Sequence, residues 1–218
     1  MNIVLVVAVH PDDETLGCGG TLLKHKMAGD KINWLICTSV NKNKNNFKSR
    51  KKEIEKVSKL YNFNTVHNLE LETTNVDKYS FSELIKKISK VFKEVKPSIV
   101  YLPFKGDVHS DHRKIFEASY SCTKVFRYSF IKKIYMMEIL SETEFAPSTK
   151  EDSFIPNVFV DITAYLKTKI EIMRIYESEI SQQPFPRSIQ NIKSLAIFRG
   201  STCNCKYAES FMLLKEIN

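Results

Sequence analysis

The chain of 218 residues lacks several features that mark specialised classes of protein. No apolar run approaches the roughly 20 residues that span a bilayer. The apolar run at residues 3–9 ends in the polar residues from His10 onward and has neither a basic segment before it nor a signal-peptide cleavage pattern after it. The 5 cysteines are scattered, with neither zinc-finger spacing nor a disulfide framework. We therefore expect a reduced, cytoplasmic protein without a transmembrane segment.

Internal repeats and low-complexity segments are also missing from the sequence. Hydrophobic residues make up 43% of the chain and charged residues 27%, which is typical of a folded globular protein. A length of 218 residues suits one sizeable α/β domain and is short for two. We therefore predict a single domain over residues 1–218.

Positive charge is the clearest excess, with a net charge of +8 at pH 7. Much of it lies between Lys42 and Lys59. One interpretation is a basic nucleic-acid-binding module with a vestigial metal site, because basic surfaces attract phosphate. However, a charge run without a nucleic-acid-binding motif is weak evidence, and lysines on an amphipathic helix usually form its solvated face. We therefore expect no nucleic-acid partner.

Strand-like and helix-like segments alternate along the chain. Residues 3–9 form a continuous apolar, β-branched run, which is typical of a strand buried on both faces of a parallel sheet. We predict strands at residues 3–9, 32–38, 66–71, 98–102, 133–139 and 158–162, and helices at residues 16–28, 47–61, 82–95, about 110–126, 163–180 and, broken near Gly200, 189–214. This order predicts an α/β, Rossmann-like fold with one mostly parallel sheet flanked by helices.

Two polar clusters follow predicted strands. His10-Pro11-Asp12-Asp13-Glu14 follows the first strand, and Asp107 to His112 follows the fourth. In open parallel sheets, ligands bind beyond the carboxyl ends of the strands. Crowded acids raise one another's pKa, a metal ion relieves that repulsion, and imidazole beside carboxylate suits zinc. Each cluster alone also fits a solvated turn that caps a helix, but together they predict a catalytic metal site with three protein ligands and an open position for water.

A Rossmann-like pattern also suggests a dinucleotide-dependent enzyme. Here the segment after the first strand is acidic where a pyrophosphate would lie, and the G-x-G-x-x-G fingerprint is absent. Both features count against that interpretation.

Three segments carry a resemblance to a known family. The stretch Ala8-Val9-His10-Pro11-Asp12-Asp13-Glu14-Thr15-Leu16-Gly17-Cys18-Gly19-Gly20 resembles the signature of the PIG-L/LmbE-like family of zinc-dependent N-deacetylases. His109-Ser110-Asp111-His112-Arg113 resembles its second motif, with Ser110 where proline is more frequent. Arg199-Gly200 and Tyr207-Ala208-Glu209-Ser210-Phe211 resemble the family's C-terminal segment, so the resemblance covers nearly the whole chain.

The resemblance implies a metal-dependent amidohydrolase with one zinc ion (Zn2+) per chain. It implies that His10, Asp13 and His112 bind the zinc, that Asp12 is the general base, and that His109 assists the tetrahedral intermediate. The residue chemistry agrees, because Asp12 can face the attacking water while Asp13 faces the metal, and His109 precedes His112 by about one helical turn.

The implied reaction is removal of an N-acyl group, usually N-acetyl, from an amino sugar. The expected partner is a small-molecule N-acylated sugar or sugar conjugate, including nucleotide- or lipid-linked glycan precursors. Arg50 resembles an arginine that contacts substrate in relatives, although with Glu53 it also fits an i,i+3 surface pair. Asp111 is a candidate for fixing the tautomer of a histidine ligand, or is an ordinary acid at a helix N-terminus.

Overall fold

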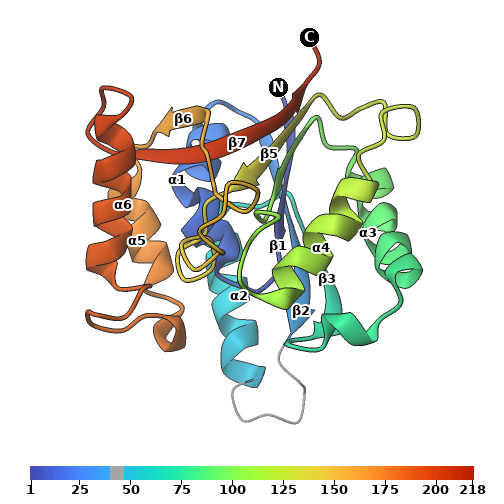
Figure 1. The fold of residues 1–218 in the computed structure, drawn as a ribbon, viewed down its shortest axis with the longest axis horizontal. Helices are drawn as coiled ribbons and strands as arrows, with labels where there is room; N and C mark the ends of the chain where they lie inside the picture. Colours follow the sequence, from blue (N-terminus) through green and yellow to red (C-terminus); the bar gives the residue numbers. More distant parts are fainter. Residues whose placement is uncertain (40–46) are drawn as a thin grey trace.

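The computed structural model describes residues 1–39 and 47–218, which form one seven-stranded sheet with helices on both faces (Figure 1). The strands are β1 (Ile3–Ala8), β2 (Lys31–Ser39), β3 (Thr65–Glu72), β4 (Ile99–Leu102), β5 (Lys133–Met137), β6 (Val158–Asp161) and β7 (Ala208–Glu216). The helices are α1 (Asp13–Met27), α2 (Phe47–Tyr61), α3 (Phe81–Val95), α4 (Ser110–Ser121), α5 (Leu166–Met173) and α6 (Ile189–Ser201), with 3-10 turns η1 (Val76–Lys78) and η2 (Glu177–Glu179).

The order of strands in the sheet is β3-β2-β1-β4-β5-β7-β6. Strands β3, β2, β1, β4 and β5 pair in parallel, whereas β7 is antiparallel to both of its neighbours. The predicted Rossmann-like, mostly parallel sheet is therefore confirmed. Strand β1 has β2 on one side and β4 on the other, so the chain changes direction across the sheet at this point. A crevice opens beyond the carboxyl ends of strands at such a point, and both polar clusters lie there.

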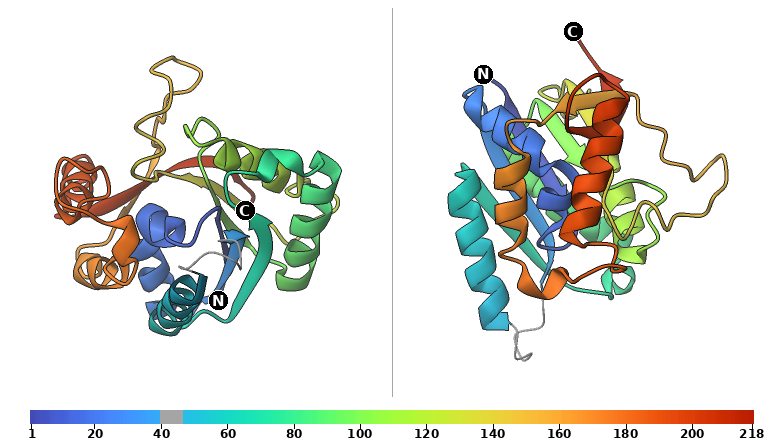
Figure 2. Two further views of the ribbon diagram at one scale, coloured as in Figure 1. Left: turned by 90° about the horizontal axis from the view of Figure 1, so that it is seen from below. Right: turned by 90° about the vertical axis from the view of Figure 1, so that its left-hand side faces the viewer.

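Alternate side chains of β1 enter two separate cores. Val4, Val6 and Ala8 belong to one core, with residues of α1, α2, α5 and α6. Leu5 and Val7 belong to the other, with residues of α3 and α4. The helices accordingly form a layer on each side of the sheet (Figure 2). Successive side chains of a strand point to opposite faces of the sheet, and both faces are buried at β1. An uninterrupted apolar run is therefore expected in this strand.

Helix α2 carries most of the predicted basic run. Val57 and Tyr61 are buried, while its lysines are exposed. These exposed residues are Lys48, Lys51, Lys52, Lys56 and Lys59. They form the solvated face expected of an amphipathic helix. Lys42 and Lys44, from the same run, lie outside the described residues.

The prediction for the C-terminal segment is wrong in part. A helix is predicted over residues 189–214, but only Ile189–Ser201 is helical and Ala208–Glu216 is strand β7. Strand β7 lies between β5 and β6, and hydrogen bonding to both neighbours outweighs its local helix propensity. Among the described residues, no helix has both the length and the apolar character needed to cross a membrane.

Two other helices are shorter than predicted. Helix α4 ends at Ser121, where the amide and hydroxyl of Thr123 both donate to the carbonyl of Tyr120. Helix α5 ends at Met173, and the chain then turns so that the Tyr176 hydroxyl donates to Glu14 at 2.9 Å. This early end brings η2 toward the first polar cluster.

Helix α1 is kinked at Cys18 (φ −147°, ψ 22°). After the kink, the amides of Gly20 and Thr21 donate to the carboxylate of Glu209 on β7, at 2.8 and 2.7 Å. Lys169 Nζ lies 2.7 Å from Glu209 Oε1 and donates to a carbonyl oxygen of the turn before the kink at 2.9 Å. A buried ion pair thus supplies the hydrogen-bonding partners that the interrupted helix would otherwise lack.

Candidate metal centre and adjoining cavity

The end of β1 and the beginning of α4 bring three predicted ligands together. His112 Nε2 lies 3.3 Å from His10 Nδ1 and 3.4 Å from Asp13 Oδ2. One donor atom from each of the three residues lies within 4.8 Å of the others. The side chains predicted as metal ligands, from positions about 100 residues apart, therefore share one point in space.

Each histidine of this triad has one ring nitrogen toward the other two residues of the triad. Its second ring nitrogen contacts a carboxylate outside the triad. His112 Nδ1 lies 2.8 Å from Asp107 Oδ2, and Asp107 Oδ1 accepts a hydrogen bond from the Thr143 hydroxyl at 2.7 Å. His10 Nε2 lies 3.4 Å from Asp111 Oδ2. A carboxylate behind each imidazole is the arrangement that orients histidines toward a metal.

The residues of the triad fit a divalent cation. Two imidazole nitrogens and one carboxylate oxygen converge, a donor set that suits zinc. Burial lowers the pKa of His112, but the negative charges of Asp13 and Asp107 outweigh that effect and raise this pKa to about 9. The surroundings of His112 therefore favour a positive charge at the point where the three donors meet.

A second set of donors lies beside the first. One donor atom each of His10, His109 and Asp111 also lies within 4.8 Å of the others. In this set, Asp111 already accepts hydrogen bonds from the backbone amides of Thr74 and Val76 at 2.7 and 3.3 Å. Asp111 therefore links His10 to the segment after β3, and it also lies in the first turn of α4, so both alternatives expected of it have a structural counterpart.

Asp12 stands between the ligands His10 and Asp13 in an uncommon backbone conformation. Its φ of 143° and ψ of −26° lie where a side chain is rarely tolerated, at a cost of about 1–3 kcal/mol. Its carbonyl accepts from the amides of Thr15 and Leu16, both at 2.9 Å, which fixes the start of α1. The Asp12 side chain is buried, and burial together with the charge of Asp13 raises its pKa well above the usual value.

Glu14 supports this strained turn. Glu14 Oε2 accepts from the amide of Asp12 at 3.1 Å, and Oε1 accepts from the hydroxyls of Thr15 at 2.6 Å and Tyr176 at 2.9 Å. The residue is fully buried, and burial raises its pKa to about 7. Glu14 thus belongs to the scaffold of the first turn and not to the converging donors.

His109 is the N-cap residue of α4. Its Nδ1 accepts a hydrogen bond from the amide of Asp111 at 3.1 Å, which leaves the proton of the neutral ring on Nε2. Burial and the neighbouring His10 lower the pKa of His109, so the neutral form is favoured. The rings of His109 and His10 are 4.7 Å apart between centroids. His109 therefore presents an N–H donor beside the triad.

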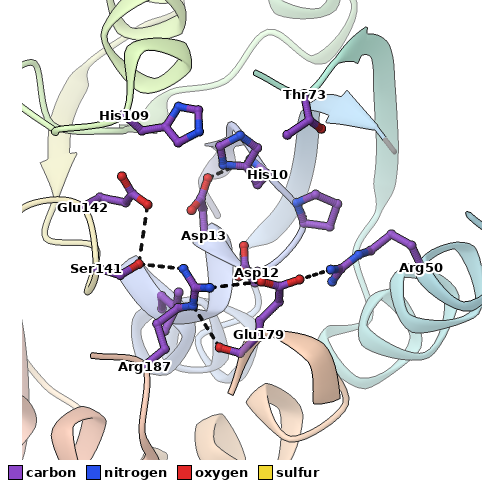
Figure 3. Close-up of a pocket in the computed structure, with 12 residues that line it drawn as sticks. His10, Asp12, Asp13, Arg50, Thr73, His109, Ser141, Glu142, Glu179 and Arg187 are labelled. Carbon is purple, nitrogen blue, oxygen red and sulfur yellow. Dashed lines mark hydrogen bonds and ion pairs between the residues drawn. The ribbon is translucent and has the colours of Figure 1, made fainter. Parts of the chain in front are cut away.

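A cavity of about 260 Å³ adjoins the triad (Figure 3). Its lining residues among those described are His10, Pro11, Asp12, Asp13, Leu16, Arg50, Thr73, His109, Ser141, Glu142, Glu179 and Arg187. Four of these side chains are carboxyl groups and two are arginines. The predicted residues Asp12, His109 and Arg50 thus open onto the same space as the triad.

Arg50 forms the i,i+3 pair expected of it and also lines the cavity. Its Nη1 lies 3.0 Å from Glu53 Oε2, the expected i,i+3 pair. Its Nη2 also pairs with Glu179 and donates to the Ser178 hydroxyl at 3.2 Å. Arg50 therefore links α2 to η2 at the wall of the cavity.

Several cavity residues were not predicted from the sequence. Glu179 and Arg187 come from segments without any motif, and no spacing relates them to the N-terminal clusters. Asp107, which contacts His112 and lies outside the cavity lining, belongs to the second cluster but was not singled out. Its place in the loop between the buried strand β4 and helix α4 is the signal that points to it.

Fold and site together define an α/β protein in which three side chains that could hold a metal ion converge at the carboxyl edge of the sheet. The sequence model of the PIG-L family, described as GlcNAc-PI de-N-acetylase, matches residues 5–123, just over half of the chain. The protein belongs to this family.

Relatives with assigned names cover nearly all of the chain. A diacetylchitobiose deacetylase from Thermococcus kodakarensis is 23% identical over 231 residues, covering 98% of this chain and 84% of the relative. The solved N,N′-diacetylchitobiose deacetylase from Pyrococcus horikoshii has a TM-score of 0.78 at 20% identity, covering 97% and 83% of the two chains. A 4-carboxy-2-hydroxymuconate hydratase from Pseudomonas putida has a TM-score of 0.77 at 14% identity, covering 100% and 98%. A hydratase superposes almost as well as a deacetylase, so structural likeness shows the fold alone. The reaction has to be inferred from the residues of the site.

Proposed function

We propose that this protein is a zinc-dependent hydrolase that removes the N-acetyl group from an amino sugar or sugar conjugate, a class that includes nucleotide- and lipid-linked glycan precursors. One observation carries the proposal: the donor atoms of His10, Asp13 and His112 converge beside a cavity that also contains the buried carboxyl group of Asp12. Membership of the PIG-L family, described as a de-N-acetylase, supports the choice of reaction. The names of the deacetylase relatives support the choice of substrate.

His10, Asp13 and His112 would hold the zinc, with Asp107 and Asp111 orienting the two imidazoles. Bound there, zinc would supply Lewis-acid polarisation of the amide carbonyl and acidify water. Iron or cobalt suits the same donors. The protein must then provide a base, a donor for the developing oxyanion, and contacts that orient the sugar.

Asp12 is the proposed general base. Its carboxyl group lies at the cavity wall, and its raised pKa makes it a better proton acceptor than an ordinary aspartate. It accepts the proton of the attacking water and passes it to the leaving nitrogen. The amide C–N bond breaks, and the products are acetate and the free amine.

His109 and Arg50 complete the proposed site. The N–H at Nε2 of His109 donates to the carbonyl oxygen as negative charge develops on it, a contribution of the oxyanion-hole kind. Arg50 lines the cavity and contacts the sugar.

The first test is the metal content of the purified protein. We expect about one zinc per chain in the wild type and a background level in His112→Ala, because two ligands remain where three are needed. His25→Ala is the matched control, since His25 pairs with Asp30 and Tyr101 away from the triad and its loss leaves the metal in place. The corresponding variants His10→Ala and Asp13→Ala are expected to behave like His112→Ala.

Activity is then measured as acetate released from N-acetylglucosamine, N,N′-diacetylchitobiose and a nucleotide-linked N-acetylglucosamine. Release by the wild type and its loss in His112→Ala are expected. Zinc binding without release from any N-acetylated sugar contradicts the proposed reaction, and wild type that binds no metal contradicts the proposed cofactor.

A further inference from the structure

We propose that Glu179 binds hydroxyl groups of the sugar and makes this site select a ring with those hydroxyl groups free over a ring phosphorylated at one of them. The inference rests on the proposed function, because it concerns the sugar that would occupy the cavity beside the triad.

Glu179 is placed to contact a ligand in the cavity. It is the last residue of η2 and lines the cavity together with Asp12 and Arg50. Its side chain is 23% exposed, so it is neither sealed in the core nor free on the surface. Figure 3 shows its carboxylate between Arg50 and Arg187, on the side of the cavity where Asp12 lies. A ring that occupies this cavity with its acetamide toward His10 and Asp13 therefore lies in the space that Glu179 lines.

The carboxylate of Glu179 is fixed from two sides. Arg50 pairs with Oε1, and Arg187 Nη2 lies 3.1 Å from Oε2. Arg187 is itself held, because its Nε donates to the backbone carbonyl of Glu179 at 2.9 Å and its Nη1 donates to the Ser141 hydroxyl at 2.7 Å. A pre-oriented acceptor loses little freedom on binding, which is the property that makes a polar group selective.

Glu179 also retains capacity to accept hydrogen bonds. An ionised carboxylate has about four acceptor positions. Among the described residues, Oε1 accepts from Arg50 and from the Ser178 hydroxyl at 3.0 Å, and Oε2 accepts from Arg187. At least one position on Oε2 therefore remains for a donor, and hydroxyl groups are the donors that a sugar offers.

The contact at Glu179 favours a neutral ring hydroxyl over a phosphate. Both arginines that line the cavity already pair with Glu179. A phosphate on the ring would meet a carboxylate whose cations are already engaged, and like charges at short range disfavour binding. A neutral hydroxyl avoids this repulsion and supplies the donor that Oε2 lacks.

The alternative is that Glu179 only ties α2 to the segment around Arg187 and never meets the sugar. Deoxy sugars separate the two roles. The experiment measures kcat and KM of Glu179→Gln and wild type, both zinc-loaded, on methyl N-acetylglucosaminide and its 3-deoxy, 4-deoxy and 6-deoxy derivatives. Glu177→Gln is the matched control, because Glu177 lies in the same turn η2 but is exposed and lies outside the cavity lining.

We expect Glu179→Gln to lower kcat/KM on the parent sugar by about 10- to 100-fold, the range for a hydrogen bond to a charged group. For the derivative that lacks the bound hydroxyl, the same substitution changes kcat/KM by less than about threefold, since the contact is already missing. Glu177→Gln matches wild type on every sugar. If Glu179→Gln does not fold, Glu179→Asp replaces it, with the same pattern expected.

Two results overturn the inference. One is an equal loss on the parent and on all three deoxy sugars, which is the signature of a purely structural tie. The other is a wild-type preference for N-acetylglucosamine 6-phosphate over the unphosphorylated sugar. Wild-type protein that binds zinc and deacetylates none of the sugars overturns the proposed function itself, and this is recognised before any variant is compared.

Discussion

Two parts of the chain build the same cavity in different ways. Residues 5–123, the part matched by the PIG-L family, supply the triad and Asp12, all close to the carboxyl ends of β1 and β4. Residues after 123 supply Ser141, Glu142, Glu179 and Arg187, from loops and the short turn η2. The part of the cavity wall formed by residues 5–123, called the first wall below, follows from the topology of a parallel sheet. The part formed by later residues, called the second wall, depends on long-range packing. Apart from Arg50, a proposed sugar contact in the first part, the comparison separates groups proposed for the chemistry from Glu179, which is proposed to select the sugar.

This division predicts that variants in the first part change the rate or the metal, and variants in the second change substrate choice or stability. Each of the following experiments tests one side of the division.

Asp12→Asn has the largest expected effect on rate. Loss of the general base lowers kcat by about 10²–10⁴-fold while the triad stays intact. Steady-state acetate release gives the rate, and elemental analysis confirms about one zinc per chain. Wild-type kcat in this variant would refute the role of Asp12 as the base.

Glu209→Gln tests how much a residue of the second part, after position 123, contributes to the stability of the protein. Removing one charge of the buried pair with Lys169 leaves the other uncompensated, which costs about 3–5 kcal/mol of unfolding free energy. The control is Glu216→Gln, whose more exposed pair with Lys133 contributes about 1 kcal/mol or less. Urea denaturation of the three proteins measures both values. Equal stabilities for the two variants would show that the buried pair of Lys169 and Glu209 contributes no more to stability than the exposed pair.

Asp107→Asn tests whether residues other than the three proposed ligands contribute to metal binding. The substitution weakens the orientation of His112 and lowers zinc affinity by about 10- to 100-fold. Competition with a chelator measures the affinity. Asp77→Asn, an exposed aspartate on η1, serves as the comparison and keeps wild-type affinity. Unchanged affinity in Asp107→Asn would limit the metal site to its three ligands.

The smallest effect concerns the backbone at Asp12. Glycine adopts φ values near 143° without a Cβ clash, so Asp12→Gly is expected to be more stable than Asp12→Ala by about 1–2 kcal/mol. Both variants lack the carboxyl group, so the comparison isolates the backbone. Equal midpoints of thermal unfolding would show that this turn stores no strain.

Much of the fold and of the first wall could be predicted from the sequence. The apolar run of β1 and the acids that follow it are adjacent in the chain, and strand order brings the cluster around His112 beside them. These signals are local, so pattern and spacing detect them. Strand β7 was mistaken for helix because its conformation depends on pairing with β5 and β6, which no local pattern reveals.

The second wall could not be predicted for the same reason. Glu179 is one of several acids in its segment, and only the contacts with Arg50 and Arg187 distinguish it from Glu177. Arg50 lies 129 residues away along the chain, and Arg187 lies 8 residues away in a turn outside any regular helix or strand. A pairing of this kind is a property of the packed molecule.

The hydrogen bonds between Glu209 and the second half of α1 join segments that the ribosome makes at different times. The acceptor for the amides of Gly20 and Thr21 lies 189 and 188 residues further along the chain, so it is synthesised later. At a translation rate of about 5–20 residues per second, that interval is roughly 10–40 s. Throughout it, a nascent chain carries the complete His10-to-Glu14 sequence but not the carboxylate that fixes the helix behind it. The His10-to-Glu14 segment is therefore made well before Glu209, and the second half of α1 gains its carboxylate partner only after Glu209 has been added.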